Sequence, residues 1–227
     1  MTQTDREASG RAPLSQAVVL SEAVSLADRE GLDAVTIRRL AQDLGVTPMA
    51  LYWHFRNKGL LLAALGDRIF GEVDLTVDPD APWSTQFRTL IRALVTTLRK
   101  HPWAGSVFTS QICESPSYLA ALEKVLAILR GAGFSPAEAT DISRHAMSTA
   151  MSLVNSRPGS TEQLAPDEAE DAQRRARLHF EALPRKRYPH IVEAAGPLTT
   201  CEDQDSSYEF GLDLLVAGVE AMAARKR

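Results

Sequence analysis

The chain has 227 residues, of which 44% are hydrophobic and 24% are charged. This composition is typical of a globular protein and excludes disordered, collagen-like and low-complexity chains, while the length allows one or two domains. The net charge of −4 and the pI near 5.8 argue, for the chain taken whole, against a nucleic-acid-binding protein.

Cysteine content and hydropathy exclude several further classes. Two cysteines, Cys113 and Cys201, lie far apart in the sequence and lack a C-x-x-C partner, which excludes a disulfide framework or a zinc cage. We interpret both as small buried side chains in a reduced cytoplasm. No run of about 18 apolar residues is present, so no membrane-spanning segment is predicted. Residues 1–13 lack the apolar core of a signal peptide and are interpreted as a disordered arm.

Helical periodicity dominates the chain from residue 14 onward. In the first third, the spacing of apolar residues predicts helices over residues 15–30, 36–45, 48–56 and 58–71. Ser15, Thr36, Thr47 and Asn57 are the expected N-caps, and Gly31 and Gly45 the expected stops.

An Asp- and Pro-rich stretch at residues 74–82 follows and predicts a domain boundary. Beyond it, helices are predicted over residues 83–101, 103–113, 117–130, 135–155, 167–183 and 207–225. The expected fold is all-α, with an N-terminal three-helix domain at 14–72 and a larger C-terminal helical bundle at 81–227.

Two predicted helices, 36–45 and 47–56, are joined by a very short glycine turn, as in a helix-turn-helix unit. Such a unit anchors its second helix by one face and presents polar or aromatic groups on the other. Leu51 and Phe55 would be the anchor. The surface near the N-terminus of the helix would contain Pro48, Met49, Ala50, Tyr52, Trp53 and His54.

Local charge favours DNA as the partner of this unit. Residues 36–58 contain four basic residues and one acidic residue, a net +3, whereas residues 1–70 are neutral and residues 71–227 carry the net −4. A positive patch attracts phosphate whatever the total charge. The alternative is an ordinary helical hairpin with residues 52–55 as an aromatic core. Neighbouring helix positions differ by about 100°, so four consecutive rings cannot all point inward, which favours DNA binding.

Three stretches carry a family resemblance: TIRRLAQDLGV at 36–46, LYWHFRNK at 51–58 and LLLAAL at 60–65. Together they are similar to the TetR (tetracycline repressor) family of transcription factors. Residues 131–135 (GAGFS) and 210–220 (FGLDLLVAGVE) add a patchier similarity to the C-terminal domain of that family. The resemblance implies an all-helical homodimer whose N-terminal domains bind a palindromic operator in double-stranded DNA, while the C-terminal bundle dimerises and holds a small-molecule effector.

The same resemblance implies a set of DNA contacts. Those near bases or adjacent phosphates would be Pro48, Met49, Ala50, Tyr52, Trp53 and His54. Thr36, Arg38 and Lys58 would hold the DNA backbone, and Arg38 would also reach a base edge. Residues 48–50 differ from those of the tetracycline repressor itself, so the operator is expected to differ.

Effector pockets in such bundles are mostly apolar with a few polar groups. The candidates here are Phe87, Leu94, His101, Trp103, Phe108, Gln111, Met147 and Met151. The alternatives are core filling for the two methionines and a surface or capping role for His101. The resemblance aligns His101 with a metal-contacting histidine, but Ser148 replaces a second histidine and residues 66–73 offer no third. We therefore expect neither a metal site nor a cofactor.

The dimer is expected to form through helices 135–155 and 207–225. Both are rich in small and apolar residues that allow close packing, including Ala146, Ala150, Leu214, Ala217 and Gly218. The core of a monomer is the alternative. A helical enzyme is disfavoured, because no nucleophile motif, phosphate loop or metal-ligand spacing is found. The sequence leaves open an activator or an effector-independent regulator.

Overall fold

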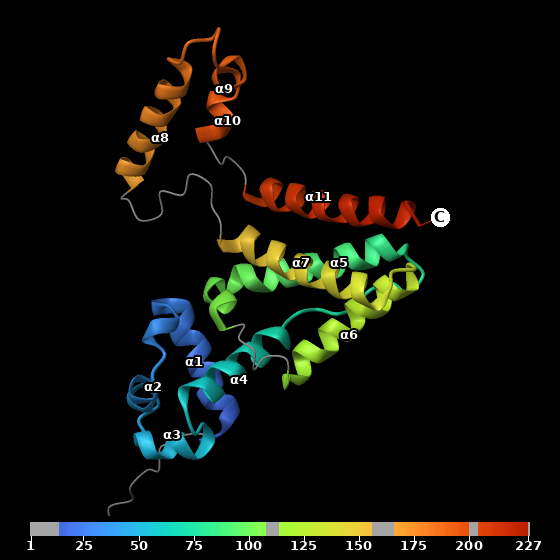
Figure 1. The fold of residues 1–227 in the computed structure, drawn as a ribbon. Helices are drawn as coiled ribbons and strands as arrows, with labels where there is room; N and C mark the ends of the chain where they lie inside the picture. The colour runs from blue at the N-terminus through green and yellow to red at the C-terminus, as the bar shows by residue number, and fades with distance from the viewer. Residues whose placement is uncertain (1–13, 108–113, 156–165, 200–203, 227) are drawn as a thin grey trace, which may run out of the picture. The chain divides into compact units, whose positions relative to one another are not determined.

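A computed structural model describes residues 14–107, 114–155, 166–199 and 204–226. Within these ranges the chain forms helices and no strand, which confirms the predicted all-α class (Figure 1). Cys113, Cys201 and the predicted N-terminal arm lie outside the described residues. None of the described helices combines the length and apolarity needed to cross a bilayer.

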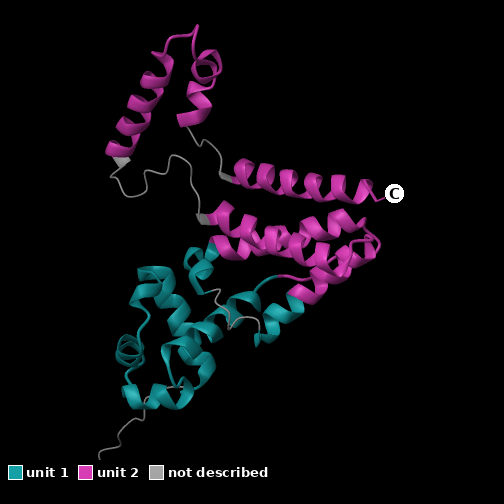
Figure 2. Ribbon diagram, in the orientation of Figure 1, with its two compact units in different colours: residues 1–73, 100–121 teal, residues 74–99, 122–227 magenta. Residues whose placement is uncertain are grey.

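The chain divides into two compact units (Figure 2). Unit 1 comprises residues 1–73 and 100–121, and unit 2 comprises residues 74–99 and 122–227. The first division falls beside the predicted boundary stretch, but residues 100–121 group with the N-terminal helices. The assignment of separate functions to 14–72 and 81–227 stays a prediction.

Unit 1 contains four α-helices and two short 3-10 helices, together with the first turns of a fifth helix, α6. They are α1 (Gln16–Glu30), η1 (Leu32–Ala34), α2 (Ile37–Leu44), α3 (Pro48–His54), α4 (Lys58–Phe70), η2 (Pro102–Val107) and α6 (Pro116–Gly131). The predicted caps are confirmed: the side chains of Ser15, Thr36, Thr47 and Asn57 each accept a hydrogen bond from a backbone N–H of the first turn. Gly31 (φ 84°) and Gly45 (φ 64°) end α1 and α2 in conformations that other residues rarely adopt.

The core of unit 1 is built from the faces that the periodicity predicted. In α1 the buried residues are Val19, Ala23, Leu26 and Ala27. Opposite them, the fully buried Leu40, Leu51, Leu61 and Leu65 come from α2, α3 and α4. Each leucine side chain of this kind contributes about 1.5–3 kcal/mol relative to full exposure, so burial on these faces fixes how the four helices pack.

Two predicted elements of unit 1 differ from the structure. The third helix ends at His54 rather than Arg56, because Phe55 adopts extended backbone (φ −135°, ψ 102°) that turns its ring into the core. The segment predicted as a helix over 103–113 begins as the 3-10 helix η2 over Pro102–Val107. Residues 108–113 are outside the described ranges.

Unit 2 contains α5 (Trp83–Lys100) up to Arg99, the rest of α6, and α7 to α11. Their bounds are α7 (Pro136–Asn155), α8 (Pro166–Glu181), α9 (Pro189–Glu193), α10 (Ala195–Thr199) and α11 (Gln204–Ala224). The fully buried Phe87, Leu98, Leu129, Phe134 and Leu212 form its core from α5, α6, α11 and the turn before α7. Helices α9 and α10 were not predicted from the sequence; Pro189 occupies the first turn of α9, a position that proline tolerates.

Candidate nucleic-acid interface

Helix α3 has one buried face and one exposed face. Leu51 is fully buried and Phe55, just after the helix, is 4% exposed. In contrast, Trp53 is 85% exposed, Met49 67% and Tyr52 45%. The aromatic run at 52–55 therefore does not form a core, and two large rings are presented to solvent.

The remaining predicted DNA contacts lie around this face. Pro48 is exposed, while Ala50 and His54 are half-buried. Thr36 accepts a hydrogen bond from the backbone N–H of Arg39 (3.2 Å), so its hydroxyl proton is free to donate to a phosphate. Arg38 and Lys58 are exposed and form no ion pair with another described residue. These groups form a short, locally positive surface around the aromatic face of α3.

Arg39 has surroundings quite unlike those of Arg38. Its guanidinium contacts both carboxylate oxygens of Glu30, the last residue of α1, at 2.6 and 2.8 Å, and both oxygens of Asp43 at 3.0 Å. The hydrogen bonds to Glu30 and then to Asp43 raise the pKa of Arg39, and Arg39 lowers the pKa of Glu30. Arg39 therefore ties α2 to α1, and its charge is compensated. The sequence signal was present in the (i, i+4) spacing of Arg39 and Asp43.

The C-terminal end of α3 is held by both neighbouring helices. The Gln16 side chain, in the first turn of α1, donates from Nε2 to the backbone oxygen of His54 at 3.2 Å. Two residues after Phe55, the side chain of Asn57 caps α4 by accepting from the N–H of Leu60 at 2.9 Å. Both α1 and α4 therefore begin beside the end of α3. The sequence analysis missed Gln16, because no local pattern marks a contact made across 38 residues.

A polar cluster of a buried histidine and two solvent-accessible carboxylates lies at the other ends of α1 and α4. His101 is 8% exposed, with Nδ1 2.8 Å from Asp28 in α1 and Nε2 3.2 Å from Glu72, two residues after α4. The indole N–H of Trp103 donates to the same oxygen of Asp28 at 2.6 Å. The rings of His101 and Trp103 meet edge to face, with centroids 5.9 Å apart.

The predicted effector residues fall into separate groups. His101 and Trp103 lie together in unit 1 and bind Asp28. In unit 2, Phe87 and Leu94 are buried on α5, while Met147 and Met151 are half-buried on α7. Phe108 and Gln111 lie outside the described residues. The effector set stays a prediction, and in the described part of the chain no group of three or more His, Cys, Asp or Glu side chains is arranged to hold a metal ion.

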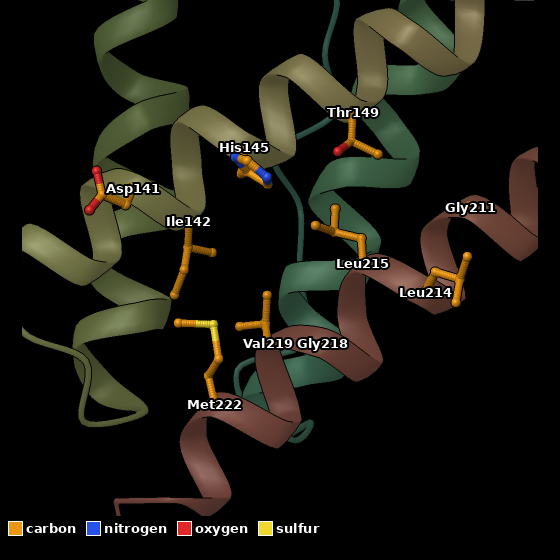
Figure 3. A pocket seen from close by; sticks show the side chains of 10 residues that line it. All are labelled: Asp141, Ile142, His145, Thr149, Gly211, Leu214, Leu215, Gly218, Val219 and Met222. Atoms are coloured by element: carbon orange, nitrogen blue, oxygen red, sulfur yellow. The ribbon is translucent and has the colours of Figure 1, made fainter.

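An apolar groove of about 620 Å³ runs between α7 and α11 in unit 2 (Figure 3). Its lining residues are Asp141, Ile142, His145, Thr149, Gly211, Leu214, Leu215, Gly218, Val219 and Met222. Phe210 (65% exposed) and Leu214 (60%) present apolar side chains on α11. Of the residues predicted to dimerise, Leu214 and Gly218 line this groove, whereas Ala146 and Ala150 are buried within the unit.

Both parts of the chain match known protein families. The family described as "Bacterial regulatory proteins, tetR family" matches residues 19–65. The family described as "Tetracyclin repressor-like, C-terminal domain" matches residues 77–223. The first match extends from α1 into α4, and the second covers more than half of the chain.

Individual relatives agree with these matches. An HTH-type transcriptional regulator of Saccharopolyspora erythraea is 35% identical over 125 residues, which are 55% of this chain and 53% of that protein, so the chain spans about half the length of this relative. The HTH-type transcriptional repressor DrrR1 of Streptomyces coeruleorubidus is 28% identical over 92% of this chain and 78% of its own length.

A solved structure is similar over nearly the full length. The TetR family protein ActR of Streptomyces coelicolor, in complex with actinorhodin, is 27% identical with a TM-score of 0.78, covering 93% of this chain and 99% of that one. With one of the two families matching 147 of its 227 residues, the chain belongs to the TetR family of bacterial transcriptional regulators.

Proposed function

We propose that this protein is a ligand-responsive repressor that binds a palindromic operator as a homodimer and is released from it by a small-molecule effector. The observation that carries the proposal is the exposed face of α3, where Met49, Tyr52 and Trp53 face solvent on a helix anchored by the fully buried Leu51. Exposed aromatic side chains beside a positive patch are suited to base edges and phosphates. Operator DNA in bacteria lies in the cytoplasm, so this function implies that compartment.

In this proposal, α3 enters the major groove. Its N-terminal residues Pro48, Met49 and Ala50, with Tyr52, Trp53 and His54, would contact bases or nearby phosphates. Thr36, Arg38 and Lys58 would hold the DNA backbone on either side of the helix. Phosphate contacts of this kind set the register of the protein on DNA, whereas base contacts provide sequence specificity.

A second copy of the chain is the proposed occupant of the α7–α11 groove. The groove is lined mainly by aliphatic side chains and glycines, and the neighbouring Phe210 and Leu214 are more than half exposed. Covering such a face removes apolar area from water, which favours association. A two-fold dimer would present two α3 helices to half-sites about 34–36 Å apart.

Effector control is supported by the similarity to ActR, which was solved in complex with actinorhodin. We infer that this chain binds a small molecule through its C-terminal bundle, with Phe87, Met147 and Met151 of unit 2 among the lining residues. Release from DNA then requires the effector to bind the non-binding conformation more tightly than the DNA-binding one.

Selection of bound fragments from random double-stranded DNA tests the proposal. We expect a palindrome whose half-site centres are about 10 base pairs apart, and we expect Trp53→Ala to reduce the enrichment. Enrichment of a single half-site would contradict the dimer, and no enrichment by the wild-type protein would contradict operator binding itself.

A further inference from the structure

The number of protons on the His101 ring decides how many of its contacts are hydrogen bonds. Both ring nitrogens lie within hydrogen-bond distance of carboxylate oxygens, Nδ1 to Asp28 and Nε2 to Glu72. An ionised carboxylate only accepts hydrogen bonds, and a neutral imidazole has a single N–H to donate. Both contacts are therefore satisfied together only when both ring nitrogens carry a proton.

The cluster joins two helices that hold the DNA-facing helix. At their first residues, α1 contacts the end of α3 through Gln16, and α4 follows α3 directly after the cap at Asn57. At their other ends, Asp28 of α1 and Glu72 after α4 meet at His101. The two helices are also in direct contact with each other. A contact between their far ends therefore restricts the orientation of α3 between their near ends.

We propose that His101, with Asp28 and Glu72, forms a proton-dependent staple that positions α3 for DNA binding. His101 is a positioning residue in this role, because it acts through α1 and α4 and does not touch DNA. The inference rests on the proposed function only where it predicts a change in operator affinity. The chemistry of the staple belongs to unit 1 alone.

The two contacts of the staple are not equivalent. Asp28 lies 2.8 Å from Nδ1 of His101 and also accepts a hydrogen bond from the indole N–H of Trp103. Glu72 lies 3.2 Å from Nε2 of His101, and its carboxylate is 3.7 Å from the guanidinium of Arg68. A histidine that keeps one proton therefore keeps Asp28 and releases Glu72. Loss of the second ring proton therefore frees the end of α4 from His101.

Glu72→Gln provides the sharpest test. A glutamine amide accepts from a protonated ring nitrogen and donates to an unprotonated one, so this variant keeps the staple at either pH. His101→Gln places an amide oxygen or a single donor opposite Glu72 and breaks the staple at either pH. His190→Gln is the matched control, because the side chain of His190 is 94% exposed on α9.

Operator affinity is measured for the four proteins at pH 6 and pH 8 and constant ionic strength. In the wild type and His190→Gln, we expect operator affinity to fall from pH 6 to pH 8. We expect this fall to be about threefold to tenfold larger than in Glu72→Gln and His101→Gln. Glu72→Gln should bind tightly at both pH values and His101→Gln weakly at both. All four proteins have the same DNA-facing residues, so any other effect of pH on DNA binding is common to them and cancels in these ratios.

Equal pH dependence in the wild type, Glu72→Gln and His101→Gln would overturn the inference. Thermal unfolding midpoints of the same proteins at pH 6 and 8, without DNA, give a second readout. There, the midpoint of the wild type should fall more steeply with pH than that of Glu72→Gln. A protein that binds no operator contradicts the proposed function, while the unfolding midpoints still decide for or against the staple.

Discussion

Arg38 and Arg39 are adjacent in sequence, and the structure separates their roles. Arg38 is exposed with no ion pair to another described residue, whereas Arg39 contacts Glu30 and Asp43. A phosphate contact releases counterions only if the cation is uncompensated beforehand. The two residues therefore form a natural matched pair for testing DNA contacts.

Arg38→Ala should weaken DNA binding and reduce the slope of log affinity against log salt by roughly one. Lys58→Ala should act in the same way. Arg39→Ala should leave the slope unchanged, because the charge of Arg39 is already balanced by carboxylates. Titrations of labelled operator at several salt concentrations measure the slope. An unchanged slope in Arg38→Ala would remove Arg38 from the interface.

Trp53→Ala should lower operator affinity by about 1–3 kcal/mol, the scale of a lost base contact. Because Trp53 is 85% exposed, the helical signal in circular dichroism should stay that of the wild type. Leu51→Ala, two positions away, should instead destabilise the fold by about 2–5 kcal/mol, because Leu51 is fully buried. Unfolding of Trp53→Ala would mean that its ring belongs to the core.

The individual residues show where sequence reasoning reached its limit. Periodicity correctly assigned Leu51 and Phe55 to the buried side. It assigned Met49, Tyr52 and Trp53 to the exposed side, because the helix repeat sets locally which side a residue occupies. It did not identify the contacts of Gln16 or of His101 with Asp28 and Glu72. These bonds join residues between 29 and 73 positions apart, and no local pattern encodes them.

At the scale of elements, helix starts were predicted better than helix ends. Every helix start with a Ser, Thr or Asn cap in unit 1 agrees with the structure, because the capping bond is made within three residues. The end of α3 was missed, since the burial of Phe55, a tertiary effect, draws the backbone out of the helix. The short helices α9 and α10 were missed because each is only five residues long.

The start of α7 combines a capping box with a contact from the end of the chain. The N–H of Ser135 donates to Glu138 at 2.8 Å, the N–H of Glu138 donates to Ser135 Oγ at 3.3 Å, and Lys226 pairs with Glu138. The hydrogen bond from Lys226, followed by those from Ser135, lowers the pKa of Glu138 to about 2. The carboxylate thus joins the start of α7 to the end of α11.

Because the folded pKa of Glu138 is depressed, its contribution to stability is present above its unfolded value, about 4.3, and is lost as the pH falls toward 2. Glu138→Gln should therefore flatten the fall of the unfolding midpoint between about pH 5 and pH 2. Glu123→Gln, at an exposed position of α6, is the control and should retain the wild-type profile. Identical profiles for both variants would show that Glu138 has no special role.

At the scale of the whole molecule, the net charge is unevenly distributed along the chain. Residues 1–70 are neutral overall and include the positive surface beside α3, while residues 71–227 carry the net −4. In unit 2, Glu209 of α11 contacts Arg92 and Arg88 of α5, each at 2.7 Å. These contacts lower the pKa of Glu209. Part of the negative charge of unit 2 is therefore paired with arginine between α5 and α11. An acidic C-terminal part discourages non-specific contact with DNA.

Leu214→Glu tests the proposed dimer. Leu214 is 60% exposed in the single chain, so a charge there should leave the fold intact, but it would be buried unpaired beneath a second copy. Leu178→Glu on α8, at a leucine that is 58% exposed, is the matched control. Analytical ultracentrifugation should show dimers for the wild type and Leu178→Glu and a 24.8 kDa species for Leu214→Glu. A wild-type protein that sediments at 24.8 kDa would contradict the dimer.

The three tryptophans of the chain occupy three different environments. Trp53 faces solvent, Trp103 is buried with its N–H bonded to Asp28, and Trp83 meets Phe134 edge to face at 6.0 Å. Their fluorescence should therefore respond to different events. A dissolved quencher would reach Trp53 first, and bound DNA would shield it, while emission from Trp103 would follow the polar cluster between α1 and α4. The molecule thus contains its own optical reporters for DNA binding and for the state of its helices, without an added label.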